Sequence, residues 1–308
     1  MSKADHTIRL TEEISIPSVG FGTYLIPEDS VTDVVKTAIE VGYRHVDTAQ
    51  GYGNEAQVGE AIKSCLTEGL IARPDLFVTT KLWPGNPAWG DPAKSKQGTI
   101  EAFDDSLAKL QLNYVDLFLI HAPSGGDMRI QQWEALVELR ELGKVRAIGV
   151  SNFSEAHIEE LKAAGLPMPN VDQIELHPWS QKPELVDYLV KNDIKPIAYS
   201  SLVPLSTWRM QDGQDSAKTA QMKADGAGAA SPFKAMAEKY DVSEAQVLLR
   251  WGVQKGYPVL PKSTNEDRMR QNLDLFSFEI DAADMALIDT MDRGAGVAWA
   301  VGDPTMMG

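Results

Sequence analysis

Residues 115–152 read VDLFLIHAPSGGDMRIQQWEALVELRELGKVRAIGVSN and contain the unit from which the fold is predicted. Two short runs rich in aliphatic residues, 115–121 and 145–152, flank an amphipathic segment at 130–144. Strands that are almost continuously apolar are typical of parallel sheets covered on both faces. The stretch therefore predicts a strand, a helix and a second, parallel strand.

The same unit recurs along the chain. Eight strand-like runs occupy residues 18–24, 43–49, 76–82, 115–121, 145–152, 171–177, 194–200 and 257–263. Amphipathic segments such as 31–42, 99–111 and 183–193 separate most of them. Eight such units in a chain of 308 residues predict a closed (β/α)8 barrel, the TIM-barrel fold. A doubly wound open sheet is the alternative, but no Gly-x-Gly-x-x-Gly follows the first run.

We expect residues 1–308 to form a single barrel domain with three additions. An N-terminal β-hairpin is predicted within 7–20, TIRLTEEISIPSVG, where it would plug the bottom of the barrel. The polar, Gly- and Ala-rich stretch 202–231 is too long for an ordinary connection, and such loops are usually functional. This loop and the tail 292–308 are therefore predicted to be flaps over the C-terminal face.

Composition restricts the partners. The formal net charge is −15, whereas a nucleic-acid or anionic-membrane partner needs a basic surface. The single cysteine, Cys65, lies in an apolar-periodic segment and is expected to be a core residue in a reducing cytoplasm. Neither a signal peptide nor an apolar run of membrane-spanning length is seen, so we expect a cytoplasmic protein. We also expect the protein to be a monomer or a weak dimer.

Polar residues lie at the carboxyl ends of the predicted strands, at the end of a barrel where active sites lie. They include Asp47, Lys81 and His121, with Tyr52 in the adjacent loop. A Tyr is a poor acid near pH 7, and a nearby ammonium such as Lys81 lowers its pKa. Asp47 can hold Lys81 in place, and neutral His121 can donate a hydrogen bond to a carbonyl oxygen. Such a group would polarise and protonate a carbonyl, while a cofactor would have to deliver the hydride.

Seven motifs give the chain a family resemblance. They are GFGTY, GYRHVDTAQGYGNE, TKLWP, YVDLFLIHAP, GKVRAIGVSNF, QIELHP and LPKSTNEDRMRQN. In this order, along nearly the whole chain, they resemble the aldo-keto reductases. The resemblance implies reversible, NADPH-dependent reduction of an aldehyde or ketone, with the dinucleotide bound across the barrel mouth.

Carried over by position, the resemblance assigns site residues. The catalytic tetrad falls on Asp47, Tyr52, Lys81 and His121, with Tyr52 as the proton donor. Cofactor-binding positions are Gly22, Thr23, Tyr24, Asp47, Ser151, Asn152, Gln173, Tyr199, Ser200, Leu202, Lys262, Ser263, Thr264, Arg268, Gln271 and Asn272. Substrate-binding positions are Tyr24, Tyr52, Trp83, His121 and Trp299. Among the cofactor positions, Ser151, Asn152 and Gln173 are assigned to the carboxamide and Tyr199 to the nicotinamide face.

Two cations bear on the choice of cofactor, and two positions differ from the residues that are common in the family. Lys262 and Arg268 are close in the sequence of a strongly acidic chain, and the resemblance makes them a clamp on a 2′-phosphate. NADPH is therefore favoured over NADH, which stays possible. Ala122 stands where the family often has a bulky aromatic residue, and Tyr24 where Trp is common. The substrate itself is not specified beyond a small carbonyl compound.

Two other classes of function are weighed against the reductase. A metal-dependent barrel hydrolase could use Asp47, His121, Glu175 and His177 as ligands. It would leave Lys81 and Tyr52 without a role, so no metal is predicted. A catalytically idle nicotinamide-binding module on the same barrel is the other alternative, against which the intact tetrad argues. His177 is expected to be structural.

Overall fold

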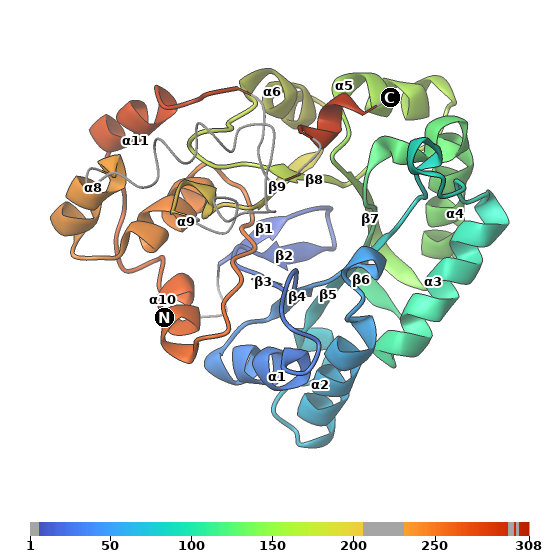
Figure 1. Ribbon diagram of the computed structural model, residues 1–308, viewed down its shortest axis with the longest axis horizontal. Coiled ribbons are helices and arrows are strands. Elements are labelled where there is room, and N and C mark those ends of the chain that lie inside the picture. Colours follow the sequence, from blue (N-terminus) through green and yellow to red (C-terminus); the bar gives the residue numbers. More distant parts are fainter. Residues whose placement is uncertain (1–5, 206–230, 295–298, 300–301, 308) are drawn as a thin grey trace.

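A ring of parallel strands forms the centre of the molecule, and helices surround it (Figure 1). The computed structural model describes residues 6–205, 231–294, 299 and 302–307. Seven strands form one parallel sheet in sequence order: β3 (Phe21–Gly22), β4 (His45–Asp47), β5 (Phe77–Leu82), β6 (Val115–Ile120), β7 (Val145–Ser151), β8 (Val171–Glu175) and β9 (Lys195–Tyr199). The predicted barrel class is confirmed.

The eighth predicted strand is shorter than expected. Only Val259 pairs in this segment, through parallel bridges to Val19 and Ala198 on either side of it. These bridges close the ring, because the backbone N–H of Val259 donates to Ser18 (2.9 Å) and the N–H of Ala198 donates to Pro258 (2.8 Å). Pro258 and Pro261 flank Val259 and have no N–H, so a longer ladder cannot form here.

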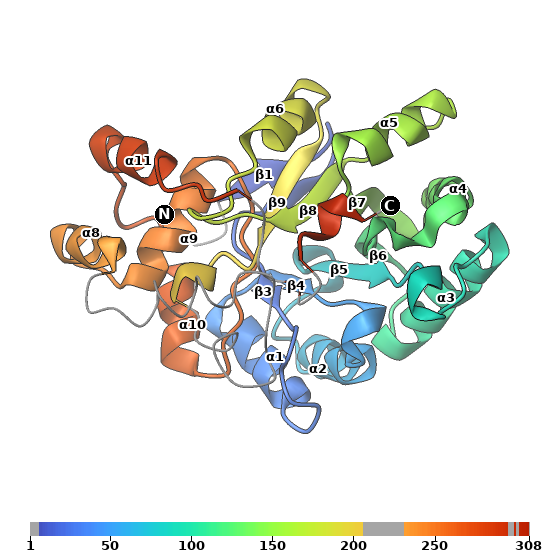
Figure 2. The same cartoon turned by 45° about the horizontal axis from the view of Figure 1, so that its top comes forward.

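Helices cover the outside of the ring (Figure 2). They are α1 (Val31–Val41), α2 (Glu55–Thr67), α3 (Lys96–Leu110), α4 (Arg129–Glu141), α5 (Glu155–Ala163), α6 (Pro183–Lys191), α8 (Pro232–Tyr240), α9 (Glu244–Gln254), α10 (Glu266–Leu273) and α11 (Ala282–Asp289). Helix α5 begins with a capping box in which the Ser154 side chain accepts from the His157 N–H. None of the described helices is long and apolar enough to cross a membrane.

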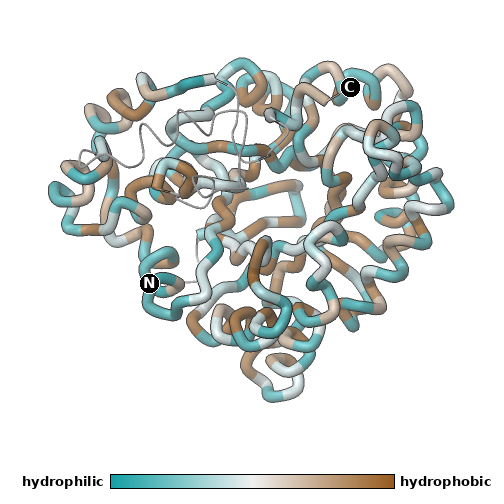
Figure 3. The backbone as a smooth tube through the Cα atoms, viewed as in Figure 1, coloured by the Kyte–Doolittle hydropathy of each residue, from teal (hydrophilic) through white to brown (hydrophobic). Residues whose placement is uncertain are grey.

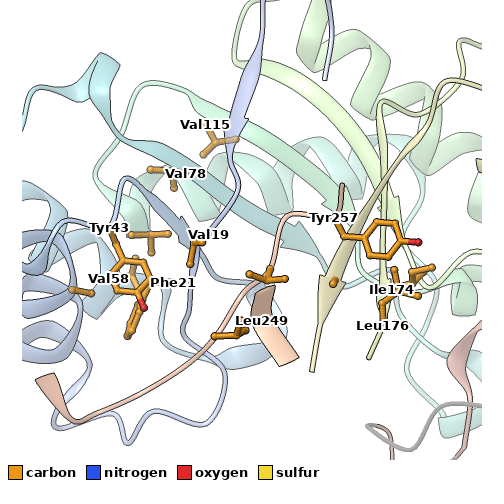
Figure 4. Close-up of a cluster of buried hydrophobic side chains, with 14 of the residues drawn as sticks. Val19, Phe21, Tyr43, Val58, Val78, Val115, Ile174, Leu176, Leu249 and Tyr257 are labelled. Atoms are coloured by element: carbon orange, nitrogen blue, oxygen red, sulfur yellow. The ribbon is translucent and has the colours of Figure 1, made fainter. Parts of the chain in front are cut away.

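Two apolar layers hold the barrel together. Side chains on the outer face of the strands, including Val78 and Ile174, pack against the helices (Figure 4). Alternate residues point inward, and there Phe77 and Leu117 pack against Ile16 of the hairpin formed by β1 (Thr7–Arg9) and β2 (Ser15–Pro17). The hairpin lies in the middle of the ring in Figure 1, as predicted for a plug. In Figure 3 the brown, hydrophobic backbone is concentrated in these inner elements.

The predicted flaps are only partly covered by the structure. Most of the loop 202–231 lies outside the described residues, as do 295–298 and 300–301 of the tail. The described part of the tail contains the short 3-10 helix η7 (Pro304–Met306). Cys65 is buried on α2, as expected of a core residue.

Candidate active site

The polar ends of β4, β5 and β6 meet at one rim of the ring. Asp47 is the last residue of β4 and pairs in register with Thr79 of β5, two residues before Lys81. Lys81 in turn pairs with Leu119 of β6, two residues before His121. Because parallel strands end at the same edge of a sheet, the three side chains converge although the chain separates them widely.

Tyr52 reaches this rim from the loop after β4. It ends the 3-10 helix η1 (Gln50–Tyr52), and Gly53 follows in the left-handed region (φ 71°), which glycine adopts without strain. Gln50 accepts a hydrogen bond from the Trp83 N–H (2.8 Å), and Asn54 donates to the carbonyl of Thr23 (3.0 Å). The side-chain amides of Gln50 and Asn54 fix the loop on both sides of Tyr52. Neither residue is among the site residues predicted from the sequence. The sequence feature that could have indicated them is their position beside Gly51 and Gly53, the two glycines that flank Tyr52.

Lys81 is the centre of the polar group. Its ammonium is fully buried and donates to Asp47 Oδ1 (2.6 Å), to the Thr48 carbonyl (2.9 Å) and to the Tyr52 hydroxyl (3.1 Å). Burial alone would lower the pKa of Lys81, but the Asp47 carboxylate and Tyr52 outweigh it, and the net pKa is raised. The ammonium therefore stays charged while it touches the phenol.

The pKa of Tyr52 is raised, whereas the nearby Lys81 ammonium alone was expected to lower it. Burial of the phenol raises the pKa above its usual value of 10.0, and the Lys81 charge and hydrogen bond offset this only in part. Asp47 adds to the rise, because its negative charge disfavours a phenolate. Tyr52 is thus a protonated hydrogen-bond donor at neutral pH, held against a cation that would stabilise the phenolate once the proton leaves.

His121 completes the group as a neutral ring. Burial and the Lys81 charge hold the pKa of His121 well below its usual value. Its ring lies 5.5 Å from that of Tyr52 at 75°, measured between centroids, and 6.0 Å from Trp83 at 89°. Neutral imidazole has one N–H, so it can donate a hydrogen bond to an oxygen without competing for the proton of Tyr52.

A second polar chain lies on the neighbouring strands β7 to β9. Gln173 donates to Asp47 Oδ2 (2.8 Å), and the Ser151 hydroxyl donates to the Gln173 carbonyl (2.7 Å). Asn152, with a left-handed backbone (φ 64°), donates to the His121 carbonyl (2.9 Å) and accepts from the Tyr199 hydroxyl (2.7 Å). The three residues assigned to a carboxamide therefore lie beside the tetrad and already share one hydrogen-bond network.

Other assigned positions separate into exposed and enclosed ones. Tyr24 is exposed and its ring lies 5.0 Å from that of Tyr52. Thr23 instead is buried, and its hydroxyl donates to the Asp47 carbonyl (3.1 Å). Gly22 is backbone-bonded to Pro261, with no room for a Cβ beside the Leu260 carbonyl. Ser200 is half-buried and Leu202 packs on the core.

The last six cofactor positions, which the family resemblance assigns to the adenosine end of the dinucleotide, lie around the start of α10. Lys262, Thr264, Arg268 and Gln271 are exposed, whereas Ser263 and Asn272 are buried. The Ser263 hydroxyl is bonded to the Asn265 backbone, and Asn272 is hydrogen-bonded to the Tyr43 hydroxyl inside the core. The two enclosed side chains thus already have partners in this structure.

Lys262 and Arg268 are two neighbouring cations at the surface. Partial burial and the neighbouring Arg268 charge lower the pKa of Lys262. Within the described residues neither side chain has an ion pair, although the chain carries a net charge of −15. By contrast Arg270, on the same helix, is paired with Glu266 (2.5 Å). Two cations that repel each other here would be relieved by an anion from outside the chain.

The substrate side is lined by aromatic rings. The Trp83 indole donates to Asp91 (2.6 Å) and stacks on Trp89 at 6.2 Å between centroids. Trp299 of the tail lies 6.1 Å from His121 at 86°. Ala122 is fully buried, so no bulky side chain extends from this position. A cavity of about 370 Å³ opens nearby and is lined by residues 86–89, Ser124, Gly126 and Met307.

Three of the four ligands of the hydrolase alternative, Asp47, Glu175 and His177, already have hydrogen-bond partners within the protein. Asp47 is bonded to Lys81 and Gln173, and His177 is buried and bonded to Glu175 Oε1 (2.7 Å), as expected of a structural histidine. Among the residues that the structure describes, no three His, Cys, Asp or Glu side chains are grouped so as to hold a metal ion.

This combination of a parallel barrel and a Tyr, Lys, Asp and His rim defines an oxidoreductase that acts on carbonyl groups. The profile of the Aldo/keto reductase family matches residues 18–293, and the chain belongs to that family. It is 37% identical to an NADPH-dependent D-xylose reductase of Meyerozyma guilliermondii and 38% identical to the glyoxal reductase of Bacillus subtilis. Each match covers 93% of this chain, and 94% and 93% of the respective relative.

A solved structure agrees with the same assignment. The aldo-keto reductase of Bombyx mori in complex with NADP superposes with a TM-score of 0.81 at 34% sequence identity. The superposition covers 93% of this chain and 92% of the other. An aldo-keto reductase from Brucella melitensis has a TM-score of 0.77 at 38% identity, over 93% and 99% of the two chains.

Proposed function

We propose that this protein reduces the carbonyl group of a small aldehyde or ketone to the alcohol, reversibly, with NADPH as hydride donor and Tyr52 as proton donor. The observation that carries the proposal is the buried Lys81 ammonium, which touches Asp47 at 2.6 Å and the Tyr52 hydroxyl at 3.1 Å. Among the described residues of the rim, no other group explains why a fully buried cation is directed at a phenol. A structural ion pair would need no such contact.

The four residues of the tetrad have different roles toward the carbonyl oxygen of the substrate. His121, neutral because burial lowers its pKa, donates a hydrogen bond that orients and polarises the oxygen. Tyr52 transfers its proton to that oxygen as negative charge develops there. Lys81 stabilises the resulting phenolate, and Asp47 keeps Lys81 charged and in place. Trp83, Tyr24 and Trp299 provide the walls that exclude water from the reacting group.

The side chains fit a nicotinamide dinucleotide. Ser151, Asn152 and Gln173 would hold the carboxamide, Tyr199 the nicotinamide face, and Ser200 and Leu202 the pyrophosphate. When bound, the cofactor supplies the hydride that none of these residues can supply. The preference for NADPH rests on Lys262 and Arg268, two cations that lack a carboxylate partner among the described residues and suit a 2′-phosphate. NADPH-dependent relatives support the same preference.

The test is a cofactor-oxidation screen with the full-length protein. Aldehydes, ketones, keto-sugars and dicarbonyls are each offered with NADPH and then with NADH, and the loss of reduced cofactor is followed by absorbance. We expect turnover with at least one carbonyl class, and a higher kcat/KM with NADPH. Oxidation of neither cofactor by any class would contradict the proposal. A requirement for a stoichiometric divalent metal ion would favour the hydrolase alternative instead.

A further inference from the structure

Both described ends of the C-terminal tail are fastened to the same short segment, residues 179–182, which precedes α6. At the first end, the Arg293 N–H donates to the Trp179 carbonyl (3.0 Å), and the Arg293 guanidinium lies 3.9 Å above the Trp179 ring. The carboxylate of Asp292 accepts from the Gln181 N–H (2.9 Å). The tail therefore starts from a fixed point at the carboxyl end of β8.

At the second end, the Asp303 carboxylate forms an ion pair with Lys182. The two side chains are only 7% and 9% exposed, although 121 residues separate them in sequence. The other carboxylate oxygen of Asp303 accepts from the N–H (3.0 Å) and hydroxyl (2.7 Å) of Thr305 and so caps η7. Figures 1 and 2 both place this red C-terminal segment beside β8.

Lys182 has an unusual backbone for this task. It is the N-cap of α6 and adopts left-handed angles (φ 46°, ψ 53°), which residues other than glycine rarely adopt. Such conformations persist where the surrounding structure fixes them, often at functional sites. A nearly buried ion pair is weak evidence for added stability, because desolvation offsets the attraction between the charges. Its contribution here is to fix a geometry.

The geometry that it fixes is that of Trp299. The Gly302 N–H donates to the Trp299 carbonyl (3.1 Å), so the backbone of Trp299 is joined to the residue before Asp303. The indole of Trp299 lies edge-on to His121, 6.1 Å between centroids, and its contact with the Tyr199 hydroxyl offsets part of the rise that burial causes in the pKa of Tyr199. Trp299 thus lies between the proposed catalytic histidine and the proposed nicotinamide-stacking tyrosine, and the Lys182–Asp303 pair holds it there.

We propose that Lys182 is a positioning residue for substrate selection: through its ion pair with Asp303 it holds Trp299 as a wall of the carbonyl site. The inference rests on the proposed reductase function and deepens it. An aromatic or otherwise bulky aldehyde would need this wall, whereas a dicarbonyl as small as glyoxal would contact mainly the tetrad. Lys182 itself touches neither substrate nor cofactor and leaves the chemical step unchanged.

The test compares substrates in matched variants. In Lys182→Met we expect the KM for an aromatic aldehyde such as benzaldehyde to rise about ten-fold, the scale of a modest loss of apolar contact in a pocket. The kcat, the KM for glyoxal and the Kd for NADPH should stay within about two-fold, since a tenfold change requires about 1.4 kcal/mol. Lys182→Arg should restore the KM. Lys144→Met, which breaks the Lys144–Asp104 ion pair (2.7 Å) elsewhere, should change nothing.

A second variant guards against misfolding. Asp303→Asn keeps an acceptor for the Thr305 N–H but removes the charge, and it should reproduce the effect of Lys182→Met. In Trp299→Ala the added Lys182→Met change should have no further effect, because both act through one wall. An unchanged KM for benzaldehyde in folded Lys182→Met and Asp303→Asn, or additive losses in the double variant, would overturn the proposal.

A readout without turnover separates this inference from the proposed function. The fluorescence of Trp299 is obtained as the difference between the wild type and Trp299→Phe. We expect its quenching by acrylamide to increase in Lys182→Met, with or without NADPH. Equal quenching would overturn the positioning role even if the enzyme is active. Increased quenching in a protein that oxidises neither cofactor would retain the positioning of Trp299 and contradict the reductase function.

Discussion

Lys81 lies near the carboxyl end of strand β5 and Lys262 follows the paired residue Val259, yet their surroundings are opposite. Lys81 is fully buried, and Asp47 and Tyr52 raise its pKa above the usual value. Lys262 is exposed at the surface. Its pKa is nevertheless lowered, because the folded chain removes part of its hydration and because the Arg268 cation lies nearby. A cation inside the chain must bring its own anion, because an unpaired buried charge is costly. A cation that faces solvent beside a second cation can instead take its anion from a ligand.

The comparison therefore separates catalysis from recognition. The Lys81 group should control the rate of the chemical step and be insensitive to salt. The group of Lys262 and Arg268 should control cofactor affinity and choice and be sensitive to salt. The following predictions test whether the two groups divide in this way.

Lys81→Met should have the largest effect. It removes the charge that stabilises the Tyr52 phenolate and leaves Asp47 buried without its cation, so we expect kcat to fall by about 10²–10⁴-fold. Single-turnover kinetics with saturating NADPH would measure it. Thermal unfolding of the same variant, and NADPH binding by fluorescence, would show whether the loss is chemical. A fall in NADPH affinity with no change in kcat would reverse the proposed division.

Arg268→Ala should weaken NADPH binding by about 10- to 100-fold, the range for losing a charge-assisted hydrogen bond. NADH binding should change by less than about two-fold, because NADH has no 2′-phosphate. Arg270→Ala is the matched control on the same helix, since Arg270 is already paired with Glu266. Titration of each variant with both cofactors measures these values. Equal losses for NADPH and NADH would show that Arg268 does not recognise the phosphate.

Added salt should weaken NADPH binding by several-fold between about 0.05 and 0.5 M, because exposed charges are screened over a Debye length of about 10 Å at 0.1 M. The kcat should hardly change, since Lys81 is out of reach of solvent ions. Measuring Kd and kcat across one salt series tests both statements. A kcat that falls in parallel with affinity would mean that the two groups are coupled.

The smallest expected effect is that of pH on kcat for reduction. The raised pKa of Tyr52 keeps the acid protonated up to and beyond its usual value of 10.0, and the lowered pKa of His121 keeps the ring neutral at pH 6.5 and above. We therefore expect kcat to vary by less than about three-fold from pH 6.5 to 9.5. A loss of activity as pH rises through 7–9 would show that the acid has a lowered pKa, as Lys81 alone would have given it.

Most of the fold follows from local sequence pattern. The aliphatic runs and amphipathic segments predicted the barrel, because each strand and helix is indicated by the pattern of its own residues. The eighth strand was overestimated, since its two prolines limit pairing to Val259. The convergence of Asp47, Lys81 and His121 was also predictable, because strand ends share one rim. A proton-donating role for Tyr52 beside Lys81 was proposed from residue chemistry, and the family resemblance then assigned Tyr52 to the catalytic tetrad.

The parts that could not be predicted depend on contacts between distant segments. Nothing in the local sequence indicates that Lys182 meets Asp303, or that the Gln173 side chain bonds to Asp47. Likewise, Asn272 was assigned to the cofactor, yet its side chain is bonded to Tyr43 in the core. The net pKa of Tyr52 was also out of reach, because the cost of burying a phenol depends on how much solvent the folded chain excludes.

The most direct test of the central claim is the hydride-transfer rate of Tyr52→Phe in a single turnover with bound NADPH and a good carbonyl substrate. The substitution removes one oxygen and keeps the ring against Tyr24 and His121. We predict a rate about 10²–10⁴-fold below that of the wild type, with the Kd for NADPH unchanged. A near-normal rate would contradict the assignment of Tyr52 as the proton donor.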